Sequence, residues 1–142
     1  MHVHFVAIAG TGMGSLAGLL KSRGHEVTGS DEGVYPPMST ALEGWGIPVD
    51  IGFAAENVTR KRPDLVVIGN AVRSDNVEAR AAIDGGMTTS SFPDALYDHA
   101  IRGKHSVVVT GTHRLPSRRD ASGRRPRQRR SRLIGRRVSR AR

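Results

Sequence analysis

The sequence predicts an α/β fold in which an open, mostly parallel sheet carries helices on both faces. Short apolar runs of strand length alternate along the chain with segments whose apolar residues recur at helical spacing. One run, DLVVIG at residues 64–69, is a continuous apolar stretch rich in β-branched residues. This is the pattern of a parallel strand that is buried on both faces of a sheet.

Predicted strands and helices alternate along most of the chain. The predicted strands cover residues 3–9, 26–30, 47–51, 64–69, 87–90 and 106–110. The predicted helices cover residues 16–22, from Pro36 or Pro37 to Gly46, 76–83, and 92–101. Gly24 stands where a helix commonly ends with a left-handed residue, so we expect it to close the first helix.

A glycine turn joins the first strand to the first helix. It reads Gly10, Thr11, Gly12, Met13, Gly14 and Ser15, which is a dinucleotide-binding fingerprint with serine in place of the third glycine. Glycine gives the backbone access to positive φ, and the missing Cβ lets an anion approach the main chain. The helix that follows offers unpaired N–H groups to the same anion. The sequence therefore predicts a Rossmann-like turn that binds a phosphate or a nucleotide.

Two further polar features follow other strands. Ser30 and Asp31 end the second strand, with the acid about twenty residues after the turn, where a dinucleotide-binding fold carries its ribose-binding acid. Asn70 and Ala71 follow the strand at 64–69. Ligands of open parallel sheets bind beyond the carboxyl ends of the strands, so we expect these residues and the glycine turn to share one site.

The charge of the chain is concentrated in its last segment. The 142 residues carry a net charge of +9, but residues 114–142 hold thirteen arginines and one acid, leaving 9 basic against 12 acidic residues in the first 113. The segment has no aromatic residue and no apolar period, so its composition predicts disorder. The chain has no cysteine, and His2, His4, His25, His99 and His105 lack the spacing of metal ligands, so we expect no metal site. No leader-like or membrane-length apolar segment is visible, so we expect a cytoplasmic protein without a membrane partner.

The successive stretches HFVAIAGTGMGSLAGLL, GHEVTGSD, DLVVIGNAV and SDNVEA resemble the N-terminal domain of the Mur ligases. These are ATP-dependent amide ligases of peptidoglycan assembly that bind UDP-N-acetylmuramate. The stretch GHEVTGSDEGVYPPMSTALEGWGI is most similar to the branch that joins UDP-N-acetylmuramate to a recycled L-alanyl-γ-D-glutamyl-meso-diaminopimelate tripeptide. The resemblance covers about residues 1–113.

The resemblance implies a Rossmann-like domain that binds a UDP-sugar rather than NAD. It places the diphosphate at residues 10–15, the uridine near Ser30 and Asp31, and the sugar-nucleotide cleft beside Asn70 and Ala71. Asp75, Asn76 and Glu78 match a family motif, and they can serve either as caps of the next helix or as ligand contacts. The partner implied is UDP-N-acetylmuramate.

The sequence departs from the family after residue 113. In Mur ligases the segment VVVTGTH continues as GKTTT, a phosphate-binding loop whose lysine reaches ATP and whose hydroxyl residue binds magnesium. Here Gly111, Thr112 and His113, the remnant of that ATP-binding loop, are followed by RLPS. We therefore expect residues 1–104 to be the UDP-N-acetylmuramate-binding domain, 105–113 the first strand of a missing ATPase domain, and 114–142 an arginine-rich tail.

Without the lysine and the metal-binding hydroxyl, we expect no ligase activity from this chain alone, and no cofactor, although the full-length family uses ATP and magnesium. The break inside a motif suggests a frameshift or a gene-prediction error, which the encoding DNA beyond His113 would settle.

Two other functions remain open from the residues. Gly10, Gly12 and Asp31 also fit an NAD-binding regulatory or dehydrogenase module. The arginine-rich tail could bind nucleic acid through phosphate contacts, but no aromatic platform accompanies it, so only non-specific binding is expected.

Overall fold

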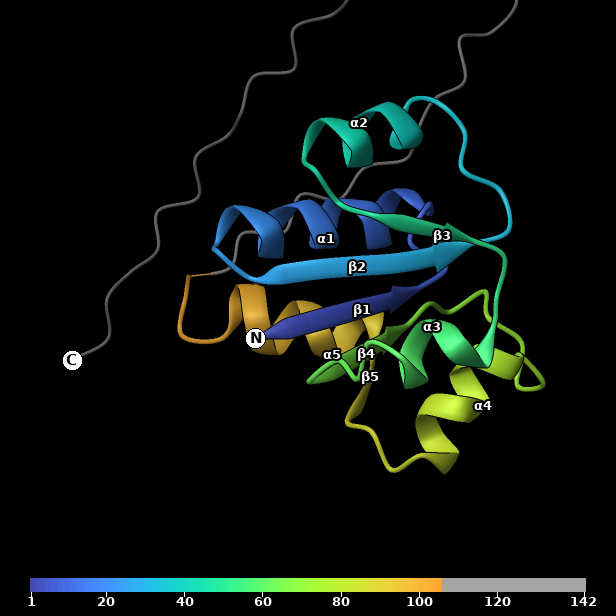
Figure 1. Cartoon of the computed structure of the whole chain (residues 1–142). Coiled ribbons are helices and arrows are strands. Elements are labelled where there is room, and N and C mark those ends of the chain that lie inside the picture. Colours follow the sequence, from blue (N-terminus) through green and yellow to red (C-terminus); the bar gives the residue numbers. More distant parts are fainter. Residues whose placement is uncertain (106–142) are drawn as a thin grey trace, which may run out of the picture. The chain divides into compact units, whose positions relative to one another are not determined.

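Five parallel strands form the centre of residues 1–105, which are the residues that the computed structural model describes (Figure 1). The strands are β1 (His2–Val6), β2 (Glu26–Asp31), β3 (Val49–Ile51), β4 (Leu65–Ile68) and β5 (Thr89–Ser91). Their order in the sheet is β3-β2-β1-β4-β5, and each neighbouring pair is parallel. The predicted α/β fold with a parallel sheet is therefore confirmed.

Helices connect the strands and cover both faces of the sheet. They are α1 (Thr11–Ser22), α2 (Met38–Gly44), α3 (Ala55–Thr59), α4 (Val77–Asp84) and α5 (Phe92–Leu96), with a π-helical turn, η1 (Tyr97–Ile101), directly after α5. Gly24 follows α1 with a φ of +84°, which confirms it as the glycine that closes this helix.

The two faces of β1 illustrate the two cores. Val3 and Phe5 point to one face, where they pack with residues of α1, α2 and α5. Val6 belongs to the other face, where Val58 of α3 and Ala82 of α4 cover it. Side chains alternate between the faces of a strand, so a central strand needs apolar residues at nearly every position.

Several predicted boundaries were wrong. Helix α1 begins at Thr11 rather than near residue 16, so Gly12 and Gly14 lie inside it. Helix α3 was not predicted, because five residues are too few for a visible apolar period. The single helix expected at 92–101 divides into α5 and η1. The expected strand at 106–110 and the arginine-rich tail lie outside the described residues.

Candidate functional site

The chain reverses its direction of winding between β1 and β4. From β1 it proceeds outward through β2 to β3, and it then returns to the other side of β1 to build β4 and β5. The connections that leave the carboxyl ends of β1 and β4 therefore diverge to opposite faces. This divergence opens a crevice at the switch point of the sheet, where open α/β folds bind their ligands.

A cavity of about 890 Å³ lies at this crevice. Its size falls in the range of about 300–1,000 Å³ that is usual for small-molecule sites. Residues that follow all five strands contribute to its lining, which consists of Ala7, Gly10, Gly12, Met13, Asp31, Glu32, Phe53, Gly69, Asn70, Ala71, Val72, Arg73, Asp75, Asn76, Val77 and Phe92.

Helix α1 begins at the edge of this cavity. The N–H of Gly14 donates to the carbonyl of Gly10 at 2.8 Å, the first hydrogen bond of the helix. The preceding N–H groups of Thr11, Gly12 and Met13 therefore have no acceptor within the helix. Gly10 supplies no capping side chain, and the first turn of α1 contains no acidic residue. This helix end can thus offer N–H donors and a positive dipole to an anion.

Gly12 and Gly14 are needed for space, and none of the three glycines of the turn has a positive φ. Gly10 has a φ of −63°, and neither Gly12 nor Gly14 has a positive φ. A Cβ on Gly12 would lie 3.1 Å from Cζ of Phe92, and a Cβ on Gly14 would run into Sδ of Met38. A Cβ on Gly10 would meet only the Ala7 carbonyl, at 3.9 Å. The expectation of positive φ at these glycines was wrong.

Ala7 takes the positive φ, of 68°, at the point where the chain leaves β1. Its N–H and that of Ile8 both donate to the carbonyl of Ser30, at 2.9 and 3.1 Å. The Asp31 carboxylate completes the anchoring, since Oδ2 accepts from the N–H of Ala9 at 2.9 Å and Oδ1 from Gly33 at 3.2 Å. The end of β2 therefore fixes the path of the turn.

The opposite wall is formed by the segment between β4 and α4. Asn76 caps α4, because its side-chain oxygen accepts from the N–H groups of Glu78 and Ala79, both at 3.0 Å. Asp75 instead forms an exposed ion pair with Arg73, at 3.2 Å. Asn76 and Asp75 also line the cavity, so capping and a contact with ligand are compatible there.

The structure brings six of the ten residues predicted from sequence to the cavity: Gly10, Gly12, Met13, Asp31, Asn70 and Ala71. The other four do not line the cavity. Thr11 and Ser15 are exposed on α1, where the Ser15 hydroxyl donates to the Thr11 carbonyl at 2.7 Å. Gly14 and Ser30 are buried. The hydroxyl of Ser30 is used inside the protein, so it does not reach the cleft.

Sequence reasoning missed the aromatic residues of the site. Phe53 follows β3 and Phe92 follows β5, and both line the cavity. The signal that could have found them is their position just after a predicted strand, which is the same signal that pointed to Asn70. The remnant loop residues Gly111, Thr112 and His113 lie outside the described part of the chain.

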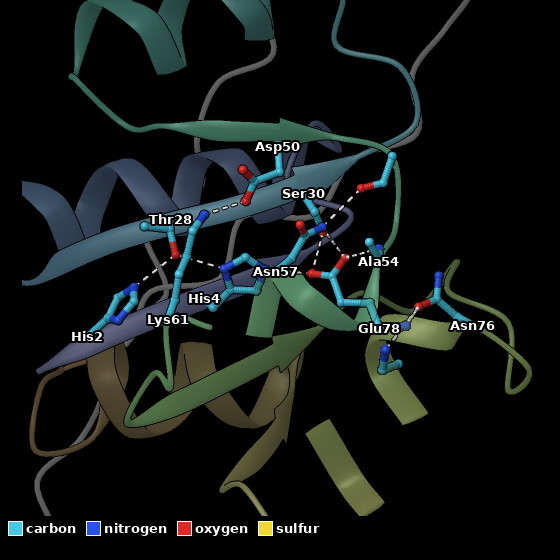
Figure 2. A network of polar contacts seen from close by, with 12 residues as sticks. His2, His4, Thr28, Ser30, Asp50, Ala54, Asn57, Lys61, Asn76 and Glu78 are labelled. Atoms are coloured by element: carbon cyan, nitrogen blue, oxygen red, sulfur yellow. Dashed lines mark hydrogen bonds and ion pairs between the residues drawn. The ribbon is translucent and has the colours of Figure 1, made fainter. Parts of the chain in front are cut away.

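Glu78 is the centre of a buried polar network beneath the cleft (Figure 2). Its Oε1 accepts from Nε2 of His4 at 2.6 Å and from the hydroxyl of Ser30 at 2.7 Å. Its Oε2 accepts from Nδ2 of Asn57 at 2.8 Å and from the N–H of Ala54 at 3.2 Å. The sequence left Glu78 as either a helix-start cap or a ligand contact, and in the structure its buried carboxylate accepts from four donors inside the protein.

The hydrogen bonds keep this buried carboxyl ionised. Burial by itself raises the pKa of Glu78, but the hydrogen bonds from His4, Ser30 and Asn57 outweigh that effect, so the pKa lies below its ordinary value of 4.5. On the other side of His4, Nδ1 lies 2.7 Å from the hydroxyl of Thr28, which also lies 2.9 Å from Nε2 of His2.

Within residues 1–105 no group of three or more histidine or acidic side chains could hold a metal ion. The helices of that same part of the chain are all too short or too polar to cross a membrane.

Comparison with known proteins identifies the family. A family model described as Mur ligase family, catalytic domain, matches residues 2–104. The UDP-N-acetylmuramate–L-alanyl-gamma-D-glutamyl-meso-2,6-diaminoheptandioate ligase of Escherichia coli (strain K12) is 44% identical over 113 residues, covering 80% of this chain and 24% of the relative. The UDP-N-acetylmuramate–L-alanine ligase of Leuconostoc mesenteroides is 37% identical over 110 residues, covering 78% and 24%.

The solved structures agree. A murein peptide ligase from Psychrobacter arcticus 273-4 superposes with a TM-score of 0.70 at 41% identity, covering 74% of this chain and 22% of that one. The chain spans about a quarter of the length of the curated relatives it matches. By sequence and by fold, the chain belongs to the Mur ligase family.

Proposed function

We propose that the cleft at the start of α1 binds UDP-N-acetylmuramate. The observation that carries this proposal is the meeting of a helix N-terminus, free of acidic residues, with a cavity of about 890 Å³ at the switch point of the sheet. The names of the curated relatives support the choice of ligand, because the ligases from both organisms act on UDP-N-acetylmuramate.

Each part of the ligand has a matching part of the cleft. The diphosphate would accept hydrogen bonds from the N–H groups of Thr11, Gly12 and Met13, and Gly10 leaves room for its oxygens. Phe53 and Phe92 offer apolar surface to the flat base or to the sugar ring.

The Asp31 carboxylate holds the glycine turn, and this does not separate a UDP-sugar from NAD, since both ligands carry a ribose. In NAD-binding domains the corresponding acid binds the ribose of the cofactor. Here both of its oxygens already accept backbone N–H groups, from Ala9 and Gly33. An acid used to hold the turn has less capacity left for the ribose hydroxyls of either ligand.

We infer further that the chain carries the UDP-sugar-binding part of a ligase of the murein peptide ligase type. The branch is favoured by the higher identity to the E. coli ligase, 44% against 37% for the Leuconostoc L-alanine ligase. Amide-bond formation would need ATP-binding and peptide-binding parts in addition to residues 1–105.

Calorimetric titration of the 142-residue chain tests the proposal. UDP-N-acetylmuramate should bind, UDP alone should bind more weakly, and NADH should give no heat. Binding of NADH without binding of UDP-N-acetylmuramate would overturn the assignment. A chain shortened after residue 113 should bind the UDP-sugar unchanged, whereas any binding of nucleic acid should be lost.

A pair of glycine variants tests where the ligand sits. Gly10→Ala adds a methyl group at the cavity edge without a clash in the protein, so the fold should be kept and the Kd should rise by about tenfold or more, equal to ~1.4 kcal/mol. Gly44→Ala makes the same change at the end of α2, where nothing lies within 4 Å, and should leave the Kd unchanged. Equal affinities for the two variants would place the ligand elsewhere.

A further inference from the structure

One buried carboxylate connects three segments of the cleft wall. Glu78 immediately follows the cavity-lining Val77 at the start of α4. Its Oε1 holds Ser30, which immediately precedes Asp31 at the end of β2. Its Oε2 holds the N–H of Ala54, which follows Phe53 of the third wall segment. Figure 2 shows these donors converging on the carboxylate from β1, β2 and the α3 region.

The wall segment around Phe53 requires an acceptor at the Oε2 position of Glu78. Both oxygens of Glu78 face donors, two on each side, and the side chain has no exposed surface. The Ser30 hydroxyl and Nε2 of His4 can also accept, after rotation of the hydroxyl or a change of tautomer, whereas the N–H of Ala54 and Nδ2 of Asn57 can only donate. A leucine at position 78 has a similar size but no acceptor, so it would leave the N–H of Ala54 without a partner. A buried donor without an acceptor is costly, and the segment that carries it moves until it finds one.

The donors on Oε2 make the Phe53 segment the part that depends most on Glu78. Asn57 uses the same Nδ2 to donate to the carbonyl of Gly52 at 3.1 Å and to Glu78 at 2.8 Å. It therefore ties both ends of the loop around Phe53 to the start of α4. Helix α3 has five residues and no side-chain cap, and its other anchors are the buried Val58 and the hydrogen bond from the N–H of Gly52 to the Asp31 carbonyl at 2.8 Å.

We propose that Glu78 is a positioning residue for the ligand cleft, in which it holds the Phe53 loop and the end of β2 against the start of α4. The carboxylate does not touch the ligand and acts through Phe53 and Asp31. The proposal rests on the function proposed above, since the cleft that Glu78 shapes is the one assigned to the nucleotide sugar.

The test compares Glu78→Leu, which removes both acceptor oxygens, with two control variants in the full chain. Leu20→Ala opens a space in the core near the end of α1 and is chosen to lower the melting temperature by a similar amount. Thr28→Val removes the hydroxyl between His2 and His4 but leaves all four donors to Glu78 in place. Thr28 touches the network only through His4, which bonds Oε1 and not the Oε2 that holds Ala54.

The first measurement is affinity for UDP-N-acetylmuramate at a temperature where all variants are folded. Glu78→Leu should raise the Kd at least about tenfold, while Leu20→Ala and Thr28→Val should stay within about twofold of the wild type. Equal Kd values for Glu78→Leu and for Leu20→Ala at matched melting temperature would show that Glu78 contributes only stability.

The second measurement needs no ligand and remains valid if the nucleotide sugar does not bind. Hydrogen exchange of the Ala54 amide, followed by NMR, should be at least tenfold faster in Glu78→Leu than in the wild type and unchanged in Leu20→Ala. Unchanged exchange at Ala54 in Glu78→Leu overturns the positioning role. If wild-type chain fails to bind the nucleotide sugar while Ala54 exchange responds, the proposed function fails and the link between Glu78 and the loop stands.

A weaker variant covers the case in which Glu78→Leu does not fold. Asn57→Ala removes one donor on Oε2 and keeps Ser30 and His4 on Oε1. It should accelerate hydrogen exchange at Ala54 and raise the Kd for UDP-N-acetylmuramate, each by a smaller factor than the Glu78 variant. An Asn57→Ala chain with unchanged exchange and affinity would contradict the proposal.

Discussion

A methyl group at position 14 would point between helices α1 and α2 and not into the ligand cleft. Built on Gly14, a Cβ meets Sδ of Met38 well inside van der Waals contact and lies 2.9 Å from Cε and 3.1 Å from the Ile8 carbonyl. Met38 is flexible and can move, but the Ile8 carbonyl belongs to the turn after β1. We therefore expect Gly14→Ala to destabilise the fold.

The size of the effect follows from two opposing contributions. Forcing extra volume into a packed site costs about 1–3 kcal/mol, whereas alanine is favoured over glycine inside a helix by about 1 kcal/mol. The backbone contact with Ile8 argues for the upper part of the range, so the expected net loss is about 1–2 kcal/mol. In a domain of this size, such a loss of folding free energy lowers the melting temperature by about 5–15 °C.

The assay is thermal unfolding followed by circular dichroism, in a double-mutant cycle with Met38→Ala. Removing the Met38 side chain frees the space, so Gly14→Ala should cost at least about 0.5 kcal/mol less in that background. Gly44→Ala is the control, since its added methyl group meets no atom within 4 Å and should not lower the melting temperature. A neutral or stabilising Gly14→Ala, or a cost unchanged by Met38→Ala, would refute the packing explanation for this glycine.

Two further predictions concern pH and the single tryptophan. Burial lowers the pKa of His2 and of His25 below 6.5, and hydrogen bonds lower that of Glu78 below 4.5 despite its burial. The folded chain then binds fewer protons than the unfolded chain, so stability is lost on acidification. The urea midpoint should begin to fall as the pH drops through about 6.5 and should fall further below about 4.5. A midpoint that rises on acidification would contradict the lowered pKa values of these three groups. A Cβ on Gly18 would lie 2.5 Å from the ring of Trp45, the single tryptophan of the chain. Gly18→Ala should therefore displace that ring from α1 and shift its fluorescence emission to the red. An unchanged emission maximum would mean that the ring does not pack against Gly18.

The position of Trp45 shows one limit of sequence reasoning. Trp45 falls inside the helix that the sequence predicts up to Gly46, and a large apolar residue of such a helix is expected to pack on the sheet. It instead follows the last turn of α2, is 43% exposed and lies against Gly18 of α1. A helical period indicates which residues share a face, but not which neighbour that face will meet.

Much of the cleft could be predicted because it depends on chain order. Parallel strands place their carboxyl ends at one edge of the sheet, so Gly10, Asp31 and Asn70 had to gather there once the strands were recognised. The exact path of the turn could not be predicted. Ala7, and none of the three fingerprint glycines, takes the positive φ, because the Ser30 carbonyl accepts the N–H groups of both Ala7 and Ile8.

The sequence alone determined the alternation of strands and helices, the edge of the sheet that carries the site, and the family resemblance that the comparisons confirmed. These features depend on local periodicity and on motifs that are contiguous in the chain. Only the tertiary structure decided that Ser30 is buried and that Glu78 gathers donors from His4, Ser30, Ala54 and Asn57. The physical reason is that the register of β1 against β2 and the packing of α3 on α4 bring these residues together, and neither is encoded in a local pattern.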